Sequence, residues 1–241
     1  MEMIEQLYSG FYLSKESCNS QISDWLKSLW VAPIKNVNKY EKLEIDYEHF
    51  AFAEKGEYFH GLENFLWING LNHSPIFIFD NHNHAPIFRY YVLKNFESDS
   101  PILIHIDQHS DCWDNQNHLE LNRNEYELQK VFYFWNEKCN VGNFIPPSLG
   151  SWIISEQIQI RSINSLQNLK INDNQNYILD IDLDFCLNWI NRNKIDYESV
   201  KILKEKFDKI WEFALCTTIA TSPYFLNQDL AIKIIEILFD E

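Results

Sequence analysis

The feature that most constrains the fold of this chain is a succession of short apolar runs, each followed by a stretch with helical spacing. The apolar runs cover residues 76–79, 102–106, 177–181 and 213–220. Runs that are short and apolar throughout are typical of strands buried on both faces. Helical spacing follows over residues 85–93, 125–135, 197–215 and 229–239. Strands that alternate with helices predict an α/β fold, a three-layer α/β/α sandwich around a mainly parallel sheet.

Residues 1–70, which we call the leading segment, have a mixed pattern and carry no motif. Apolar periodicity near residues 22–30 predicts a short helix, and partial alternation over 43–53 predicts a strand. The chain holds only 6 Gly and 7 Pro, no repeat and no low-complexity tract, so nothing in it resembles a linker. We therefore expect residues 1–241 to form a single domain.

Charge and composition exclude several classes of partner. With 46% hydrophobic residues the chain can build a core, while a formal net charge of −15 disfavours binding to nucleic acid or to an anionic membrane. No apolar run approaches the roughly 18 residues of a membrane span, and the first residues are acidic, unlike a secretory signal. The 5 cysteines are scattered and form no C-x-x-C pair. These features predict a cytoplasmic protein with reduced thiols, and they leave its oligomeric state, including a homo-oligomer, open.

Polar residues follow three of the four predicted strands. Their sequences are DNHNH at 80–84, DQHSD at 107–111 and DIDLD at 180–184. In parallel sheets, ligands bind beyond the carboxyl ends of the strands, which is where these residues stand. Strand alternation puts the carboxylates of Asp180, Asp182 and Asp184 on one face, and buried carboxylates are costly unless they are paired or bind a cation. Polar turns exposed to water would explain the same patterns without any ligand.

Six of these side chains form a candidate metal site: His82, Asp107, His109, Asp111, Asp180 and Asp182. Four of the six are carboxylates, whose charges would balance two divalent ions. A carboxylate-rich site with few imidazoles suits Mn²⁺ better than a thiolate-loving metal. Two such ions side by side make the arrangement of a two-metal hydrolase.

The motifs resemble those of the arginase (ureohydrolase) superfamily. More narrowly, DNHNHAPIF, HIDQHSD, GNFIPP and LDIDLDFC resemble an uncharacterised arginase-like family that includes the peptide arginases of ribosomal peptide natural-product maturation (RiPP biosynthesis). The resemblance covers residues 76–235, and the two Asp motifs are its specific part. It does not cover the leading segment.

The resemblance implies two manganese ions with shared ligands. It implies that His82, Asp107, Asp111 and Asp180 hold one ion, and that Asp107, His109, Asp180 and Asp182 hold the second. Asp107 and Asp180 would then bridge the ions, and Asp111 would act in catalysis by accepting a hydrogen bond from the nucleophilic hydroxide. The reaction implied is hydrolysis of an arginine guanidinium to ornithine and urea.

This chain departs from ordinary arginases in ways that bear on the substrate. FDNH replaces their GGDH, the second motif lacks the leading Ser and the closing Asp-Pro, and Thr221 and Ser222 stand where arginases carry a substrate-holding Glu. The site motifs also include no Lys or Arg to hold an α-carboxylate. We therefore expect an arginine side chain within a peptide, rather than free arginine, to be the substrate.

Other residues are weaker candidates for catalysis or substrate binding. His84, with His105 and His118 as alternatives, is a candidate proton shuttle, although a histidine beside a metal is more often a hydrogen-bond partner. Asn143 is a candidate for positioning substrate, but an Asn that closes a Pro-Pro turn fits equally well. Ser222 and Asp229 are candidates for binding the guanidinium, and Asp229 alternatively complements a helix dipole.

Four other functions compete with this interpretation. A phosphatase or nucleotide-sugar transferase would use Asp180 and Asp182 on Mg²⁺, but a phosphatase needs that motif early in the chain and a transferase leaves Asp107 unexplained. An amidohydrolase barrel built on His82 and His84 would nearly exhaust the chain with its eight strands. Another metal-dependent C–N hydrolase, of deacetylase type, stays open. In a non-enzyme alternative, the metals stabilise a peptide-binding module.

Overall fold

A seven-stranded sheet forms the centre of the computed structural model, which describes residues 3–14, 28–69, 74–94, 100–122, 125–172, 174–188 and 194–240. In spatial order its strands are β3 (Ile34–Val37), β6 (Phe65–Ile68), β7 (Ile76–Phe79), β11 (Ala214–Ala220), β10 (Tyr177–Asp182), β8 (Ile102–Ile106) and β9 (Glu156–Ile160). The five strands from β7 to β9 are parallel. Strands β3 and β6 run parallel to each other and antiparallel to β7.

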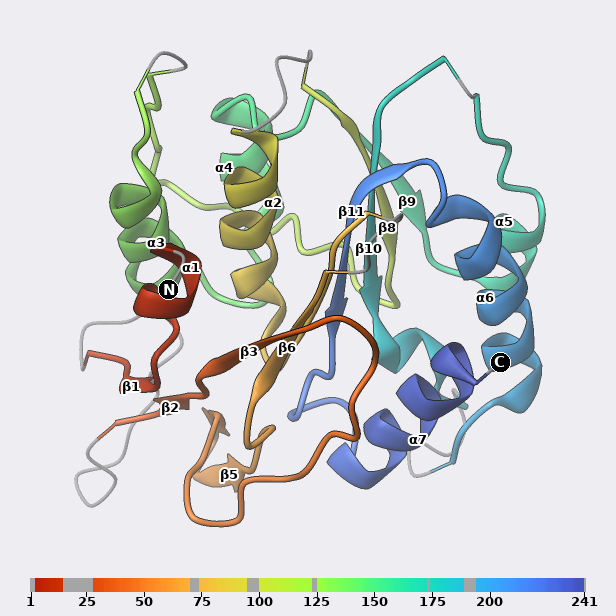
Figure 1. Ribbon diagram of the computed structural model, residues 1–241, viewed down its shortest axis with the longest axis horizontal. Helices are drawn as coiled ribbons and strands as arrows, with labels where there is room; N and C mark the ends of the chain where they lie inside the picture. The colour runs from red at the N-terminus through yellow and green to blue at the C-terminus, as the bar shows by residue number, and fades with distance from the viewer. Residues whose placement is uncertain are drawn as a thin grey trace.

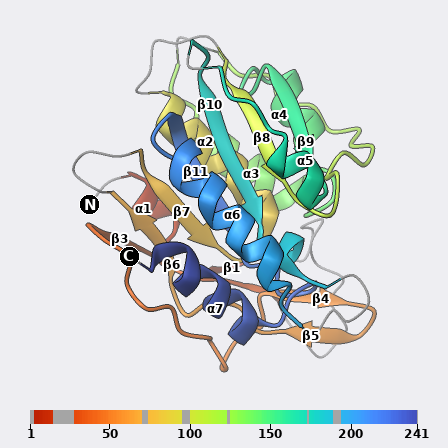
Figure 2. The same ribbon diagram turned by 90° about the vertical axis from the view of Figure 1, so that its right-hand side faces the viewer.

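Helices cover both faces of this sheet. Figure 1 shows α1 (Met3–Leu7), α2 (Ala85–Leu93), α3 (Leu128–Glu137) and α4 (Ile145–Gly150) on one side. The other side carries α5 (Ile163–Gln167), α6 (Tyr197–Ile210) and α7 (Gln228–Phe239), which face the viewer in Figure 2. The predicted α/β/α sandwich with a mainly parallel sheet is therefore confirmed. Within the described ranges, no helix combines the length and the apolar character needed to cross a membrane.

The four predicted strands are present with small changes at their ends. β7 and β8 have the predicted bounds, β10 extends to Asp182 and β11 begins at Ala214. The predicted helix over 197–215 was too long, since α6 ends at Ile210 and the apolar residues after Phe213 belong to β11. Strands β3, β6 and β9 were not predicted. β9 has the sequence EQIQI and lies at the sheet edge, where polar side chains are tolerated.

The predictions for the leading segment were less accurate. The strand expected over 43–53 is interrupted because Asp46 Oδ1 accepts hydrogen bonds from the backbone N–H groups of Glu48 and His49, which turns the chain. Only its end forms a strand, β4 (Phe52–Glu54), which pairs with β5 (Glu57–Phe59) as a hairpin. Of the helix expected near 22–30, residues 22–27 lie outside the described residues. Trp30 belongs to β2 (Trp30–Val31), which pairs with β1 (Phe11–Tyr12).

The leading segment nevertheless helps to build the edge of the sheet where the polar clusters lie. The side-chain amide of Asn81 donates to the carbonyl of Ala51 at 2.9 Å. The backbone N–H of Leu62 donates to Asp80 Oδ1 at 2.8 Å, and Asp80 is buried. Burial raises the pKa of Asp80 to about 7. The loop that carries His82 is thus anchored to the leading segment directly before the histidine.

A substitution at Gly61 tests how tightly the contact between the leading segment and Asp80 is packed. A Cβ at Gly61 would press on Asp80 Oδ2 and come within 2.6 Å of Ala51 Cβ. We expect Gly61→Ala to lower the free energy of unfolding by about 1–3 kcal/mol, as overpacking does elsewhere. Urea denaturation measures the change. Gly150→Ala is the control, because nothing lies within 4 Å of its new Cβ and its effect should stay within about 0.5 kcal/mol. Equal midpoints for both variants would contradict the packing assigned to Gly61.

Candidate metal centre

Three loops meet at the carboxyl edge of the sheet and bring the polar clusters together. Asp107 directly follows β8, Asp182 is the last residue of β10, and His82 begins a short 3-10 helix (His82–His84) after β7. The parallel pairing of β10 with β8 places Asp180 beside His105, so that the ends of the two strands are level. The fold thus converts motifs that lie far apart in the sequence into a single buried group.

We call five of these side chains the inner cluster: His82, His105, Asp107, Asp111 and Asp182. The Nδ1 atom of His82 lies 3.3 Å from Asp107 Oδ2, 3.2 Å from Asp111 Oδ2 and 3.3 Å from Asp182 Oδ2. The Nε2 atom of His105 lies 3.3 Å from the same Asp107 oxygen. Two imidazoles and three carboxylates therefore point at one buried position.

Asp107, His109 and Asp184 form a second group, the outer cluster. The Nδ1 atom of His109 lies 2.9 Å from Asp184 Oδ2 and 3.4 Å from Asp107 Oδ1. Asp107 contributes Oδ2 to the inner cluster and Oδ1 to the outer one. The side chain of His109 is 39% exposed, so the outer cluster is the part of the site that reaches solvent.

Asp180 lies beneath both clusters and is already saturated by protein partners. Its Oδ1 atom is 2.5 Å from Arg89 Nη2 and accepts a hydrogen bond from the Thr218 hydroxyl at 2.6 Å. Its Oδ2 atom accepts from His105 Nδ1 at 2.7 Å and from His82 Nε2 at 2.9 Å. Burial opposes ionisation of Asp180, but Arg89 and the two imidazoles hold its pKa well below the usual range. Asp180 therefore orients both histidines so that their other nitrogens face the inner cluster.

The unpaired atoms of the two clusters fit a cation. Among the described residues, the buried side-chain atoms without a hydrogen-bond partner include His82 Nδ1, His105 Nε2, Asp107 Oδ2 and Asp184 Oδ2. Four groups of three side chains have ligand atoms that all lie within 4.8 Å of one another. Such atoms are costly to bury alone, and a divalent cation satisfies imidazole and carboxylate lone pairs together. The buried His and Asp residues can thus hold metal ions.

The protonation equilibria show how the clusters balance their charge without a metal. Hydrogen bonds to Asp107 and Asp184 raise the pKa of His109 to about 10. Burial lowers the pKa of His105, but hydrogen bonds to Asp107 and Asp180 outweigh it and raise the pKa to about 9. Burial and the charge of Asp107 raise the pKa of Asp111 to about 7. Protonated imidazoles therefore stand among the carboxylates at neutral pH.

All six predicted metal ligands lie in this neighbourhood. His82, Asp107, Asp111 and Asp182 belong to the inner cluster, His109 belongs to the outer cluster, and Asp180 lies beneath them. Sequence reasoning missed Asp184 as a ligand candidate, although its alternation with Asp180 and Asp182 was a usable signal. It also considered His105 only as a proton shuttle or hydrogen-bond partner, and it did not consider Arg89, which has no local motif.

Two residues near the clusters have an unusual backbone conformation. Asp111 has φ = 51° and Ser222 has φ = 48°, in the left-handed region that side chains other than Gly, Asn and Asp disfavour. Ser222 donates its hydroxyl to Asp182 Oδ2 at 2.5 Å. Such conformations often mark functional sites, where the surrounding structure maintains them. Ser222 thus lies at the inner cluster, but it positions a carboxylate there.

The remaining candidates lie in other surroundings. His84 is buried and forms a hydrogen bond between its Nδ1 and the Tyr8 hydroxyl at 3.0 Å, and burial lowers its pKa to about 3. Asn143 closes a turn by accepting from the backbone N–H of Asn140. Asp229 is exposed in the first turn of α7. The roles in proton transfer and substrate binding expected for these residues stay predictions.

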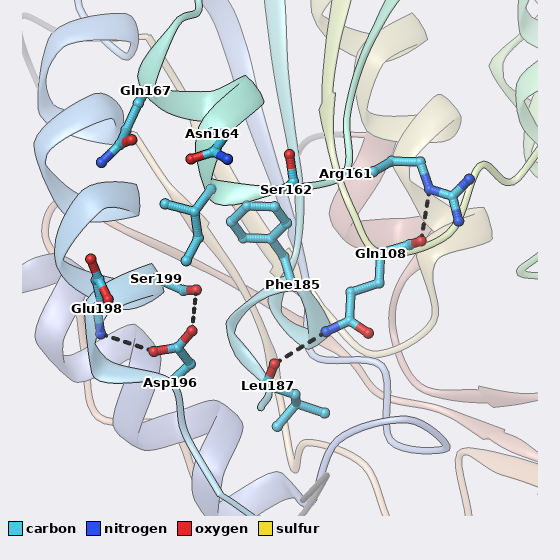
Figure 3. Close-up of a pocket in the computed structure, with 11 residues that line it drawn as sticks. Gln108, Arg161, Ser162, Asn164, Gln167, Phe185, Leu187, Asp196, Glu198 and Ser199 are labelled. Carbon is cyan, nitrogen blue, oxygen red and sulfur yellow. Dashed lines mark hydrogen bonds between the residues drawn. The ribbon is translucent and has the colours of Figure 1, made fainter. Parts of the chain in front are cut away.

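A polar pocket of about 410 Å³ lies next to the site, between α5 and α6 (Figure 3). Gln108 separates it from the outer cluster, because its side-chain amide donates to the carbonyl of Asp184 at 2.6 Å. Arg161 donates from Nε to the carbonyl of Gln108 at 2.9 Å. Asn164 and Gln167 of α5 line the same pocket. The pocket wall therefore supports the backbone between Asp107 and His109.

Comparison with known proteins adds no assignment: no family model matches the chain, and no curated protein is similar to it.

The pair formed by Arg89 and Asp180 generates a stability prediction. Arg89→Leu would leave the fully buried Asp180 carboxylate without its guanidinium partner. We expect the free energy of unfolding of the metal-free protein to fall by about 3–5 kcal/mol, as is usual when one partner of a buried ion pair is lost. Urea denaturation in a chelating buffer measures it. The double variant with Asp180→Asn should recover part of the loss, because neither charge then stands alone. Strict additivity of the two single variants would contradict the pairing.

Proposed function

We propose that this protein is a dinuclear metal hydrolase that cleaves the guanidinium of an arginine side chain within a peptide, giving ornithine and urea. The observation that carries the proposal is the position of Asp107, whose two oxygens face two separate groups of His and Asp ligands. A carboxylate shared in this way is suited to holding two cations a few ångströms apart, as two-metal hydrolases require. The motif resemblance to arginases supplies the substrate class.

The geometry favours a ligand set displaced by two residues along the DIDLD motif from the one expected, with Asp184 in the short 3-10 helix (Leu183–Cys186) that follows β10. Both oxygens of Asp180 are engaged by Arg89, Thr218 and the two histidines. Asp182 Oδ2 faces His82 Nδ1 at 3.3 Å while it also accepts a hydrogen bond from Ser222, and Asp184 Oδ2, which has no hydrogen-bond partner among the described residues, faces the outer cluster. In this assignment the inner cluster holds one ion and the outer cluster holds the second, with Asp107 between them. Asp180 orients His82 and His105 instead of binding both ions.

Manganese fits these ligands, and two such ions would polarise the guanidinium and make a water molecule nucleophilic at neutral pH. Asp111, whose Oδ2 atom lies 3.2 Å from His82 Nδ1, would accept a hydrogen bond from that water, which is the role that the motif resemblance implies. Water adds to the guanidinium carbon, the bond from this carbon to the side-chain nitrogen breaks, and the nitrogen gains the proton. The products are urea and an ornithine residue.

A peptide substrate agrees with the charges around the clusters. Arg89 is fully buried, with Nη2 2.5 Å from Asp180 Oδ1, so it offers no exposed cation to the α-carboxylate of an amino acid. A net charge of −15 favours the approach of cationic substrates. An arginine within a peptide offers the cation without the carboxylate.

Metal stoichiometry distinguishes the two ligand sets. We expect Asp107→Asn to lose both ions, Asp184→Asn to lose one ion, and Asp180→Asn to keep two. Elemental analysis after dialysis against Mn²⁺ measures the content of each variant. The reason is that Asp107 is shared, Asp184 belongs to the outer cluster alone and Asp180 is saturated by protein partners. If Asp180→Asn instead lost both ions and Asp184→Asn kept both, the ligand set expected from the motifs would be the correct one.

Proton release provides an independent check on metal binding. Because the pKa of His109 is raised to about 10 and that of His105 to about 9, both imidazoles carry protons at pH 7 that a metal must displace. Mn²⁺ binding should therefore release protons, and the affinity should fall as the pH is lowered. Titration calorimetry in two buffers with different ionisation enthalpies measures the release. His109→Gln should release fewer protons, and identical heats in both buffers would argue against this site.

Urea release tests the reaction itself. With equal manganese loading, we expect kcat/KM to be higher for a peptide whose arginine is flanked on both sides than for free arginine. Conversion of the peptide arginine to ornithine, followed by mass spectrometry, should match the urea formed. Asp107→Asn serves as the inactive control. A preference for free arginine would overturn the peptide assignment, and turnover of an acetylated amine in place of either would indicate a deacetylase.

A further inference from the structure

A line of aromatic rings extends from the outer cluster to the leading segment. The ring of Phe225 lies 4.4 Å from the ring of His109, measured between centroids, and 4.7 Å from Tyr224. Tyr224 in turn lies 5.3 Å from Phe59 and 5.4 Å from Phe52. We call Phe52, Phe59, Tyr224 and Phe225 the aromatic wall. It joins the solvent-facing side of the site to residues that the motif resemblance does not cover.

The wall is connected to the clusters through a strand pairing and hydrogen bonds. Phe52 and Phe59 face each other across the β4–β5 hairpin, which Figures 1 and 2 show beyond the carboxyl ends of the strands. Tyr224 and Phe225 follow β11 in a turn in which the backbone N–H of Phe225 donates to the carbonyl of Ser222 at 2.9 Å. Ser222 is itself bonded to Asp182. The spacing between the wall and the inner cluster is thus fixed by a short chain of bonds.

Exposure distinguishes this wall from ordinary core packing. Of its four rings, only Phe52 is buried, at 7% exposure, whereas Phe59, Tyr224 and Phe225 are half-buried. His109, on which Phe225 rests, is the exposed residue of the outer cluster. A ligand that reaches this cluster from the side of His109 therefore contacts Phe225.

The chemistry of the wall suits a planar cation. Aromatic faces attract guanidinium groups, which stack on them more readily than ammonium groups do. The Nδ1 atom of His109 lies 2.9 Å from Asp184 Oδ2 and 3.4 Å from Asp107 Oδ1, so the charge of this imidazole is balanced where the wall ends. The pocket between α5 and α6 has amide and mixed-charge walls instead (Figure 3). Gln108 divides it from the outer cluster.

We propose that the aromatic wall is the binding subsite for an arginine-containing peptide, which rests on the function proposed above. The arginine guanidinium stacks on Phe225 next to His109, and the neighbouring peptide residues lie along Tyr224 and Phe59. In this arrangement the leading segment supplies substrate recognition through the β4–β5 hairpin. Phe225 is a binding residue and takes no part in bond cleavage.

Binding without turnover tests the wall separately from the reaction. The protein is dialysed against a chelator, and calorimetry measures its affinity for an arginine peptide and for the same peptide with citrulline, the uncharged analogue. The wild-type chain should prefer the arginine peptide. Phe225→Leu, which keeps an apolar side chain but removes the ring, should weaken arginine-peptide binding by about tenfold and leave citrulline-peptide binding nearly unchanged. Phe225→Tyr, which keeps the ring, should retain the preference.

Control variants test whether the loss of affinity is specific to the aromatic wall and whether Phe225→Leu is folded. Gln167→Ala alters the pocket between α5 and α6 and should leave the affinity for both peptides unchanged. Urea denaturation of Phe225→Leu checks that the chain is folded, and Phe59→Ala, made on a different element, should also weaken arginine-peptide binding. In the manganese-loaded protein, Phe225→Leu should raise KM for the arginine peptide and change kcat little.

The outcomes separate this proposal from the proposed function. If no urea forms, but the wild type prefers the arginine peptide and Phe225→Leu loses that preference, the aromatic wall is supported as the subsite and the proposed reaction is wrong. If Phe225→Leu and Phe59→Ala bind both peptides as the wild type does, the wall is not the subsite. An effect of Gln167→Ala in place of Phe225→Leu would likewise overturn it and place the peptide in the pocket.

Discussion

The site depends on one buried charge, the carboxylate of Asp180. It lies in the interior strand β10, where four partners reach it: Arg89 from α2, Thr218 from β11, and His82 and His105 from the neighbouring loop and strand. An unpaired carboxylate in this position would cost several kcal/mol, so the four contacts are a condition for the fold as well as for the site. Because both imidazoles bond Asp180 through one nitrogen, their other nitrogens are directed into the inner cluster. The hydrogen bonds to Asp180 thus set the orientation of His82 and His105, two candidate metal ligands.

The leading segment is part of the same construction. It extends the sheet with β3 and β6, anchors the loop of His82 through Asp80 and Asn81, and supplies two rings of the aromatic wall. The residues of the clusters come after Pro75, whereas two of the four rings of the aromatic wall come from residues before it. A segment without motifs therefore contributes to the surroundings of the candidate site.

The sequence was informative where one local pattern decides the outcome. Apolar runs predicted β7, β8, β10 and β11 because buried strands need apolar residues on both faces, and the acids after them were placed at one edge by parallel pairing. It was uninformative where partners are distant, as for the contact between Arg89 and Asp180. It also could not fix which Asp of the DIDLD motif faces the clusters, because alternation puts Asp180, Asp182 and Asp184 on the same face. In the structure, Asp180 and Asp182 lie on β10, whereas Asp184 lies beyond its end, in the short 3-10 helix Leu183–Cys186.

The left-handed backbone at Ser222 has a consequence for how this position can vary. A glycine there would relieve the conformational strain at φ = 48°, and an asparagine would tolerate it, so either would favour stability. Glycine, however, would remove the hydroxyl that binds Asp182. Serine at this position therefore gives up conformational stability for a hydrogen bond that positions the Asp182 carboxylate. Under selection for thermal stability alone, we would expect Ser222 to be replaced before the other residues of the site.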